Sequence, residues 1–358
     1  MVLGNKDKLI NLIVEEIRDY RNKDNIFIDY NHVLKWINQF DINEQEILLE
    51  ETLNFIKNRY FREKDFYNFY KSNLETIFGI DYMNSLNEIC LLDIQKYGTS
   101  QHELVNLMNS VLMKEKGITI STEYLNKKNY IYLDEGIFSG NRIINDLKSF
   151  IFDNDVKDVK IIIQVIISHT EAEQYIKAKL LDITQERNID FQLFRAIISN
   201  NTNMNHNGVI YPEVIPSDQI SRKFLAEFDN YFNDFPNYYY LDETTFDKDF
   251  KLFSSTDNVE LIVEVFLKYG IKLLNEFSPN ELVRPLGFSK LLNLGFGAIF
   301  FTYRNIPNNC PIIFWYNERE IFDNKCKTYG WFPLFPRKFS KENVAYNNKG
   351  KSLLKWKV

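Results

Sequence analysis

The stretch that decides the fold is Asn129-Tyr130-Ile131-Tyr132-Leu133-Asp134-Glu135-Gly136-Ile137-Phe138-Ser139-Gly140-Asn141-Arg142. Residues 130–133 are aromatic or branched with no polar interruption, which is typical of a strand buried on both faces of a parallel sheet. After the loop, apolar residues recur at helical spacing, at Ile143, Ile144, Leu147, Phe150 and Ile151. The stretch therefore predicts a strand, a loop and a helix in that order.

Two carboxylates and a loop of small residues lie between that strand and that helix. Asp134 and Glu135 come where the strand is expected to end, and Ser139-Gly140-Asn141 leads into the helix. The first backbone N–H groups of a helix have no partner within it, and together with the helix dipole they favour an anion such as phosphate. Carboxylates accept hydrogen bonds from neighbouring hydroxyls. The pattern indicates a site for a phosphorylated sugar.

A simpler interpretation of the same residues stays open. A strand followed by a helix often ends in polar residues, and Asp134 and Glu135 would then only solvate the end of the strand. A short motif of this kind is a hypothesis about function, which the surrounding structure has to support.

The stretch resembles the signature of the type I phosphoribosyltransferases, in which two hydrophobic residues and two acids precede a short loop ending in Thr-Gly. The resemblance covers residues 130–142, with Glu135 for the commoner second Asp, Ser139 for Thr, and Asn141-Arg142 where a small residue and Thr are usual. It implies that Asp134 and Glu135 are the catalytic pair and hold the ribose hydroxyls of phosphoribosyl pyrophosphate, with Mg²⁺ bound through that ligand. It also implies a loop that binds the 5′-phosphate, formed by Gly136, Ile137, Phe138, Ser139, Gly140 and Asn141.

Composition places the chain among globular proteins. Its 358 residues are 45% hydrophobic and 26% charged, and that length allows one large domain or two ordinary ones. The net charge of −6 gives the surface as a whole no cationic field to attract nucleic acid. Lysines gather in the tail at 341–358, where a local basic patch and a merely solubilising end are both consistent with the sequence.

The cysteines and histidines form no metal or disulfide pattern. Cys90, Cys310 and Cys326 have no paired short spacing, and the four histidines show no ligand spacing. The sequence also has no signal peptide and no apolar run long enough to cross a membrane. We therefore expect a protein of the reducing cytoplasm without membrane association.

Four regions follow one another along the chain. Amphipathic helical patterns predict a helical module over 1–80, and alternating strands and helices predict an α/β core over 85–216. Residues 217–340 are expected to form a helical insertion and a C-terminal segment that completes the core and covers the cleft, and 341–358 are the basic tail.

The core is expected to be an α/β fold with a Rossmann-like parallel sheet. Branched runs at 89–94, 159–167 and 191–198 predict further strands, separated by helical patterns. This alternation implies right-handed crossovers and a ligand at the carboxyl edge of the strands. Together with the signature, it predicts the sheet of the type I phosphoribosyltransferase kind, with additional helical and irregular C-terminal elements.

Two further positions share that edge. The turn Gly98-Thr99-Ser100-Gln101 is a candidate anion site, and in the phosphoribosyltransferase comparison it falls where the first loop contacts pyrophosphate. An ordinary helix start, with Ser100 as the N-cap and Gln101 and Glu103 in the first turn, explains the turn equally well. His169, at the end of the strand 159–167, is a candidate cleft group near the leaving group or base, although a lone histidine there is more often structural.

The C-terminal segment combines prolines, glycines and aromatic residues, notably Pro307-Asn308-Asn309 and Trp331-Phe332-Pro333-Leu334-Phe335-Pro336-Arg337. Such a combination favours fixed turns over periodic structure. Asn308, Asn309 and Arg337 are candidate polar groups of the cleft, or else form a tight turn and cap a carbonyl. The segment resembles phosphoribosyltransferase-like proteins of bacterial conflict and antiphage loci, some beside reverse transcriptases in retrons. That resemblance, over roughly 85–340, implies a defence role.

Two functions from different classes follow. The first is a phosphoribosyltransferase-like antiphage effector that binds phosphoribosyl pyrophosphate with Mg²⁺, or a nucleotide, and transfers or cleaves at the anomeric carbon of the ribose. The second is an inactive nucleotide sensor or scaffold that binds a protein from the same locus or a reverse transcriptase with its DNA. A P-loop nucleoside triphosphatase is disfavoured because the chain has no Gly-x₄-Gly-Lys-Ser/Thr motif.

Overall fold

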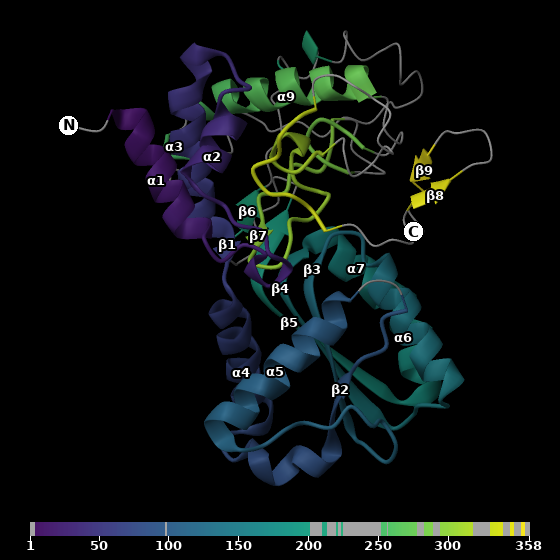
Figure 1. Cartoon of the computed structure of the whole chain (residues 1–358). Helices are drawn as coiled ribbons and strands as arrows, with labels where there is room; N and C mark the ends of the chain where they lie inside the picture. The colour runs from purple at the N-terminus through teal and green to yellow at the C-terminus, as the bar shows by residue number, and fades with distance from the viewer. Residues whose placement is uncertain are drawn as a thin grey trace. The chain divides into compact units, whose positions relative to one another are not determined.

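The computed structural model describes residues 4–96, 99–200, 210–212, 220, 223–224, 252–255, 257–277, 283–288, 294–317, 330–338, 344–346 and 352–354. The chain forms two compact units (Figure 1). The first contains residues 1–62, 201–204 and 212–357, and the second contains residues 63–200 and 205–211 with the last residue. The units separate between Arg62 and Glu63, whereas the sequence pattern placed a boundary near residue 80.

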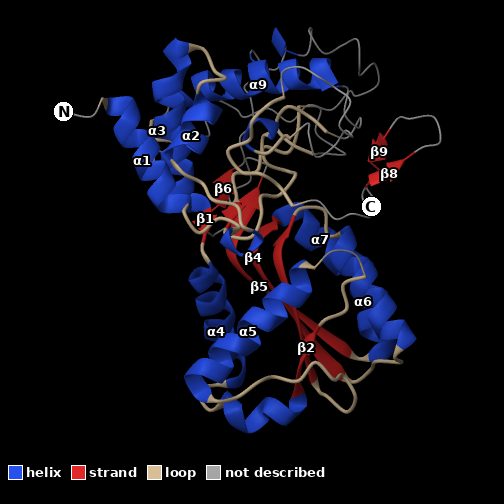
Figure 2. Cartoon of the chain, viewed as in Figure 1, coloured by secondary structure: helices blue, strands red, loops and turns tan. Residues whose placement is uncertain are grey.

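The second unit is built on a parallel sheet. Strands β2 (Ile89–Leu92), β3 (Asn129–Ile137), β4 (Val159–His169) and β5 (Ile189–Asn200) lie side by side in chain order, and β6 (Ile210–Pro212) follows β5. All three pairs from β2 to β5 are parallel. Figure 2 shows these strands with helices around them. The predicted α/β fold with a parallel sheet and N-terminal helices is confirmed.

Helices cover both faces of this sheet. Helices α6 (Asn141–Asp153) and α7 (Thr170–Arg187) bury their apolar side chains in one cluster with residues of β2, β3 and β4, including Tyr132, Ile163 and Val165. Gln164 lies between Ile163 and Val165 and therefore faces the opposite side, where Asn73 of α4 (Glu63–Phe78) donates a 3.4 Å hydrogen bond to it. Helix α5 (Ser100–Lys116) contacts α4 and β3, and η2 (Tyr82–Glu88) leads into β2.

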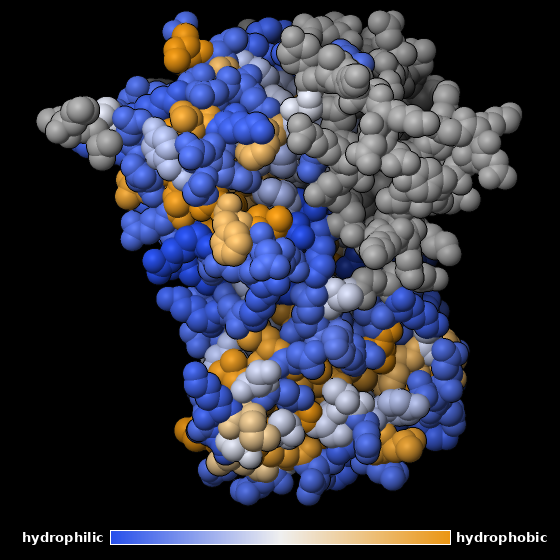
Figure 3. Space-filling model, viewed as in Figure 1, coloured by the Kyte–Doolittle hydropathy of each residue, from blue (hydrophilic) through white to orange (hydrophobic). Residues whose placement is uncertain are grey.

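Burial on both faces explains the sequence of β4. From Ile161 to His169 each residue of the strand is buried, so branched apolar side chains satisfy both layers of packing. The outer surfaces of the second unit still expose apolar side chains, and Figure 3 shows such atoms among polar ones. The large exposed ones in this unit are Ile80, Met83, Met113, Tyr124, Leu125, Phe152, Tyr175 and Leu181.

The first unit combines helices with an irregular aromatic core. Its regular elements are α1 (Asn5–Ile17), η1 (Asn22–Asp24), α2 (Tyr30–Ile37), α3 (Ile42–Arg59), α9 (Asp257–Phe277) and η4 (Ile312–Phe314). Its strands are β1 (Tyr60–Phe61) paired in parallel with β7 (Phe301–Thr302), and β8 (Val344–Tyr346) paired antiparallel with β9 (Ser352–Leu354).

Aromatic side chains join the two ends of the chain in this unit. The indole N–H groups of Trp36 and Trp331 both donate to the carbonyl oxygen of Ile313, at 3.1 and 2.9 Å. The rings of Phe301 and Phe335 stack with centroids 4.8 Å apart. Gly287 has a φ of +103°, and a Cβ there would lie 2.3 Å from the carbonyl oxygen of Asn309, so only glycine fits.

Cys90 and Cys310 are buried, and Cys326 lies outside the described residues. Burial raises the pKa of Cys90 to about 12, so this thiol is inert packing. Among the described residues, no helix combines the length and the apolar character that a membrane crossing requires.

Candidate functional site

Strand β3 is longer than its hydrophobic run. Its pairing with β4 continues past Leu133, with Asp134 opposite Val165 and Gly136 opposite Ile167. The predicted acids therefore lie within the last part of the strand, and the loop to α6 shortens to Phe138, Ser139 and Gly140. The hydrogen-bonding partner β4 is long enough to hold these polar residues in extended form.

The two acids differ in exposure. Asp134 is only 5% exposed, and its Oδ1 accepts the Glu135 backbone N–H at 2.8 Å. The hydroxyl of Tyr70 donates to the Asp134 carbonyl oxygen at 2.9 Å, which ties this end of the strand to α4. Glu135 is half-buried. The backbone under the acid pair is thus fixed, and Glu135 is the more accessible carboxylate.

The bend after the acids opens directly into a helix. Gly140 stands at the N-cap of α6 with a φ of +75° and gives no side-chain cap, and the first helical bond runs from the Ile144 N–H to the Gly140 carbonyl at 3.1 Å. The amides of Asn141 to Ile143 precede that bond and have no partner within the helix. Ser139 is exposed beside them. This arrangement can bind an anion such as phosphate.

A cation and a third carboxylate accompany the acid pair. Desolvation lowers the pKa of Arg142, but attraction to Asp134, Tyr132, Asp146 and Glu135 raises it above its usual value. Asp146 is 7% exposed and accepts the Tyr132 hydroxyl at 2.9 Å. Burial raises the pKa of Asp146 to about 6, against the lowering effects of Tyr132 and Arg142.

The sequence interpretation did not single out Tyr132, Arg142 or Asp146 as functional residues. The available signal was the spacing of Arg142 and Asp146, which are four residues apart and therefore neighbours on one face of a helix. Their closeness to Tyr132 and Asp134 depends on how α6 packs on the sheet, which the spacing alone does not fix.

Metal binding fits this site only in part. Mg²⁺ prefers oxygen ligands and is usually held by one or two carboxylates together with substrate phosphates. Asp134 and Glu135 supply carboxylate oxygens of that kind. Within the described ranges, no group of three or more His, Cys, Asp or Glu side chains is arranged to hold a metal. The donor set suits an ion that is bound mainly through a phosphorylated ligand.

The loop at 98–101, the second predicted anion site, is fixed by hydrogen bonds from its own and neighbouring side chains. The carboxamide oxygen of Gln101 accepts the N–H groups of Ile94 and Gln95, and that of Gln95 accepts from the Ser100 hydroxyl and the Gln101 N–H. Thr99 donates to Glu103 at 2.8 Å. Gly98 lies outside the described residues. A role for this loop with pyrophosphate remains a prediction.

His169 is buried where β4 passes into α7, and its neighbour Ser168 pairs with Ile137 of β3. The ends of β3 and β4 thus lie side by side, as the parallel sheet requires. Asp134, Ser139 and His169 all belong to this carboxyl edge. The chemical role of His169 stays a prediction.

Asn308, Asn309 and Arg337 belong to the first unit. The carboxamide of Asn309 donates to the Phe288 carbonyl at 3.0 Å, and the Asn308 carbonyl accepts the Phe288 N–H at 2.7 Å. The guanidinium of Arg337 donates to the Ile306 carbonyl at 2.9 Å and lies over the Trp315 ring. These contacts suit a turn and a carbonyl cap, and a role of these side chains in the cleft stays a prediction.

A family model matches most of the chain. Residues 33–337 match the family model PRTase-CE, which spans most of the chain and includes the acid pair, the bend and the C-terminal aromatic segment. No curated protein and no solved structure matches the chain.

Proposed function

The chain belongs to the PRTase-CE family, the phosphoribosyltransferase-like proteins of conflict systems, and from this premise we propose that it binds phosphoribosyl pyrophosphate or a nucleotide at the carboxyl edge of β3. The observation that carries the proposal is the sequence of an acid pair, a left-handed glycine and an uncapped helix start within eight residues, Asp134 to Asn141. A ribose phosphate needs acceptors for its hydroxyls and donors for its phosphate, and this segment supplies both.

Each group has a distinct role in the proposal. Asp134 and Glu135 accept hydrogen bonds from the ribose hydroxyls, and the amides at Ser139, Gly140 and Asn141 hold the 5′-phosphate. Arg142 supplies a positive charge that offsets the three carboxylates, which would otherwise repel an anionic ligand. Phosphoribosyltransferases generally use phosphoribosyl pyrophosphate with Mg²⁺, and here the ion would neutralise the pyrophosphate while contacting the acid pair.

The same residues suit chemistry at the anomeric carbon. When the bond from that carbon to its leaving group breaks, the leaving group takes the electron pair and positive charge develops on the sugar. Carboxylates fixed close to the ribose stabilise that charge more than the neutral ground state, which is the condition for catalysis. Transfer to an acceptor and hydrolysis by water differ only in which nucleophile forms the new bond.

Calorimetry with phosphoribosyl pyrophosphate and Mg²⁺ tests the site. Wild type should bind, and Asp134→Asn/Glu135→Gln should bind at least about a hundredfold more weakly, since two charge-assisted hydrogen bonds are lost at about 1.5 kcal/mol each. The matched control is Asp182→Asn/Glu186→Gln, an exposed acidic pair on α7 of the same unit. Equal affinity of the two double variants would contradict the proposal.

One observation favours a catalytically silent protein. Asp134 is nearly inaccessible and its carboxylate accepts a backbone N–H next to it, so Glu135 is the more accessible carboxylate and Asp134 has less freedom to follow a reaction. A nucleotide sensor or scaffold needs binding without turnover. An assay for pyrophosphate or free-base release separates the two functions: release that the double variant lacks establishes the enzyme, and tight binding without release establishes the sensor.

The cellular setting is part of the same proposal. A family of conflict systems suggests antiphage defence, in the cytoplasm and with a protein or nucleoprotein partner encoded nearby, for which a reverse transcriptase with its DNA is the candidate. Protection of cells from phage by wild type, lost in Asp134→Asn/Glu135→Gln, would tie defence to the site. Unchanged protection would assign defence to other surfaces.

A further inference from the structure

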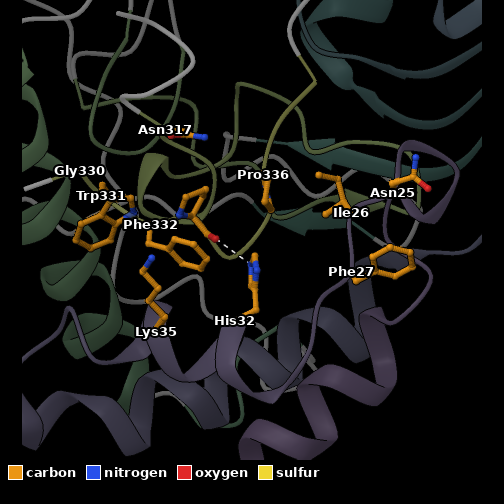
Figure 4. A pocket seen from close by; sticks show the side chains of 11 residues that line it. Asn25, Ile26, Phe27, His32, Lys35, Asn317, Gly330, Trp331, Phe332 and Pro336 are labelled. Carbon is orange, nitrogen blue, oxygen red and sulfur yellow. Dashed lines mark hydrogen bonds between the residues drawn. The ribbon is translucent and has the colours of Figure 1, made fainter. Parts of the chain in front are cut away.

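The first unit contains a cavity of its own. It has a volume of about 310 Å³ and lies between α2, the turn after η1 and the segment around Trp331 to Pro336. The volume is at the lower end of the range in which small-molecule pockets occur. Figure 4 shows the side chains that line it, with His32 and Lys35 directed from α2 toward that segment.

Specific contacts hold the wall of this cavity in place. Nε2 of His32 is 3.1 and 3.0 Å from the carbonyl oxygens of Pro333 and Leu334, so this nitrogen carries a proton and donates to them. The His32 ring also packs against Phe332, with centroids 4.7 Å apart. Lys35 Nζ lies 4.2 Å from the centre of the Phe332 ring. The aromatic wall and the ammonium group therefore form one fixed arrangement.

The lining is polar at its edges and positive overall. Among the lining residues that the structure describes, Lys35 is the one with a full charge and none is a carboxylate. Burial lowers the pKa of His32, which keeps it neutral at pH 7. Asn25 and Asn317 contribute carboxamides, which can donate and accept at once. Phe27 also lines the cavity and is 71% exposed, so its ring is accessible to a ligand.

We propose that this cavity binds a planar nitrogen heterocycle that carries a phosphate. The ring stacks on Phe27, the carboxamide of Asn25 beside it pairs with the edge of the base, and Lys35 holds the phosphate. Two sources share this chemistry, a free mononucleotide and the terminal nucleotide of a single strand. The site is in the first unit, so it is separate from the acid pair of the second and does not depend on it.

Binding is measured by calorimetry on the full chain carrying Asp134→Asn/Glu135→Gln, which removes the contribution of the acid pair. The probes are the nucleoside monophosphates of the four bases, the corresponding nucleosides, and a short single-stranded oligonucleotide with a terminal phosphate. Lys35→Gln should weaken monophosphate binding about tenfold and leave nucleoside binding unchanged, because only the charge contact is lost. Phe27→Ala should weaken both about tenfold through loss of stacking.

Matched variants guard against general effects. Lys8→Gln removes an exposed lysine of α1, and Ile42→Ala removes an exposed apolar side chain at the start of α3, both in the first unit and outside the cavity. Hydrogen exchange should show protection on ligand addition in residues 25–35 and 330–336. Tighter binding of the oligonucleotide identifies a strand end as the source, and equal or weaker binding identifies the free nucleotide.

Three results would overturn the proposal. They are the absence of binding by every probe at millimolar concentration, a Lys35→Gln variant that binds monophosphates as well as Lys8→Gln does, and protection confined to other segments. None of them bears on the acid pair, whose failure would show instead as unchanged phosphoribosyl pyrophosphate binding in the acid-pair variant.

Discussion

The hydroxyl of Tyr132 lies 2.9 Å from Oδ2 of Asp146, and both side chains are buried beneath the acid pair of β3. This contact joins the strand that carries Asp134 to the helix that opens at the bend. Because Asp146 is held away from water, its pKa rises to about 6. The group under the proposed site therefore titrates below neutral pH, in a range where ordinary aspartates are already ionised.

Stability should fall as the pH rises through this titration. An unfolded aspartate has a pKa of about 3.9, so between that value and about 6 the folded chain binds more protons than the unfolded chain. The free energy of unfolding should lose up to about 3 kcal/mol over this window. Asp146→Asn should remove the loss, so urea unfolding of the two proteins at stepped pH should diverge. Parallel curves would contradict the burial argument, and Asp153→Asn, an exposed change on the same helix, is the control.

Loss of the Tyr132 hydroxyl should lower the free energy of unfolding most when Asp146 is ionised. In Tyr132→Phe the carboxylate loses a donor in a buried site, which costs about 1–3 kcal/mol. The hydroxyl lowers the pKa of Asp146, so its removal should raise that pKa further. The destabilisation measured by urea should thus be larger at pH 7 than at about pH 4, where the acid is protonated. A penalty that does not change with pH would show that the hydroxyl serves packing alone.

Gly140 and Gly117 form a matched pair for the bend. Both have positive φ, +75° and +69°, but a Cβ on Gly140 would lie 2.7 Å from Cγ1 of Ile176, whereas Gly117 has open space around it. Gly117→Ala should cost about 1–2 kcal/mol for the left-handed backbone alone. Gly140→Ala should cost about 2–4 kcal/mol because α7 must also shift. Thermal unfolding measures the stability loss of both variants, and equal losses would mean that Ile176 of α7 moves aside at little cost.

Glu51 should be important for the first unit although it is remote from any proposed ligand. Its carboxylate is fully buried in α3 and accepts the Ser254 N–H at 3.0 Å, the Ser254 hydroxyl, and the Asn258 carboxamide at 2.7 Å. Glu51→Ala leaves these donors without an acceptor and should destabilise the protein by about 2–4 kcal/mol. Glu50→Ala, at the exposed neighbouring position, should change stability by less than about 0.5 kcal/mol.

Arg142 should set the affinity of the proposed site for anions. Without its charge, Asp134, Glu135 and Asp146 leave the site strongly negative, so Arg142→Gln should weaken binding of phosphoribosyl pyrophosphate about tenfold. The loss should shrink at high salt, since exposed charges are screened. Calorimetry at two ionic strengths checks this, with Lys177→Gln on α7 as the control. An unchanged affinity would place the bound phosphates away from the start of α6.

The hydrophobic run at 130–133 was enough to predict a buried parallel strand, but not where the strand ends. The apolar pattern stops at Leu133, whereas backbone pairing with β4 continues to Ile137. Pairing depends on the length of the neighbouring strand, which is a tertiary property. The pairing with β4 holds Asp134 and Glu135 in extended form. The α/β alternation was recognisable because each strand is branched and each helix amphipathic.

The site was predictable only in its local part. Asp134, Glu135, Gly140 and the start of α6 lie close together in the chain, so their type and spacing were enough to predict a candidate site. The Tyr132–Asp146 contact spans a strand and a helix, and the cavity beside His32 requires residues about three hundred positions apart. The sequence held no local signal for such pairs. The aromatic C-terminal segment predicted turns, but not that Ile313 would accept from both Trp36 and Trp331.

The division of the chain into two units has a consequence for its synthesis. The second unit is nearly continuous from Glu63 to Asn200, whereas the first combines α1 to α3 with α9 and the segment that ends near Pro336. On the ribosome, the α/β sheet emerges with its helices and can fold at once, while α1 to α3 lack the partners that they have in α9 and the C-terminal segment until those residues are made. A nascent chain arrested before α9 should therefore carry a folded middle and a beginning that chaperones still hold.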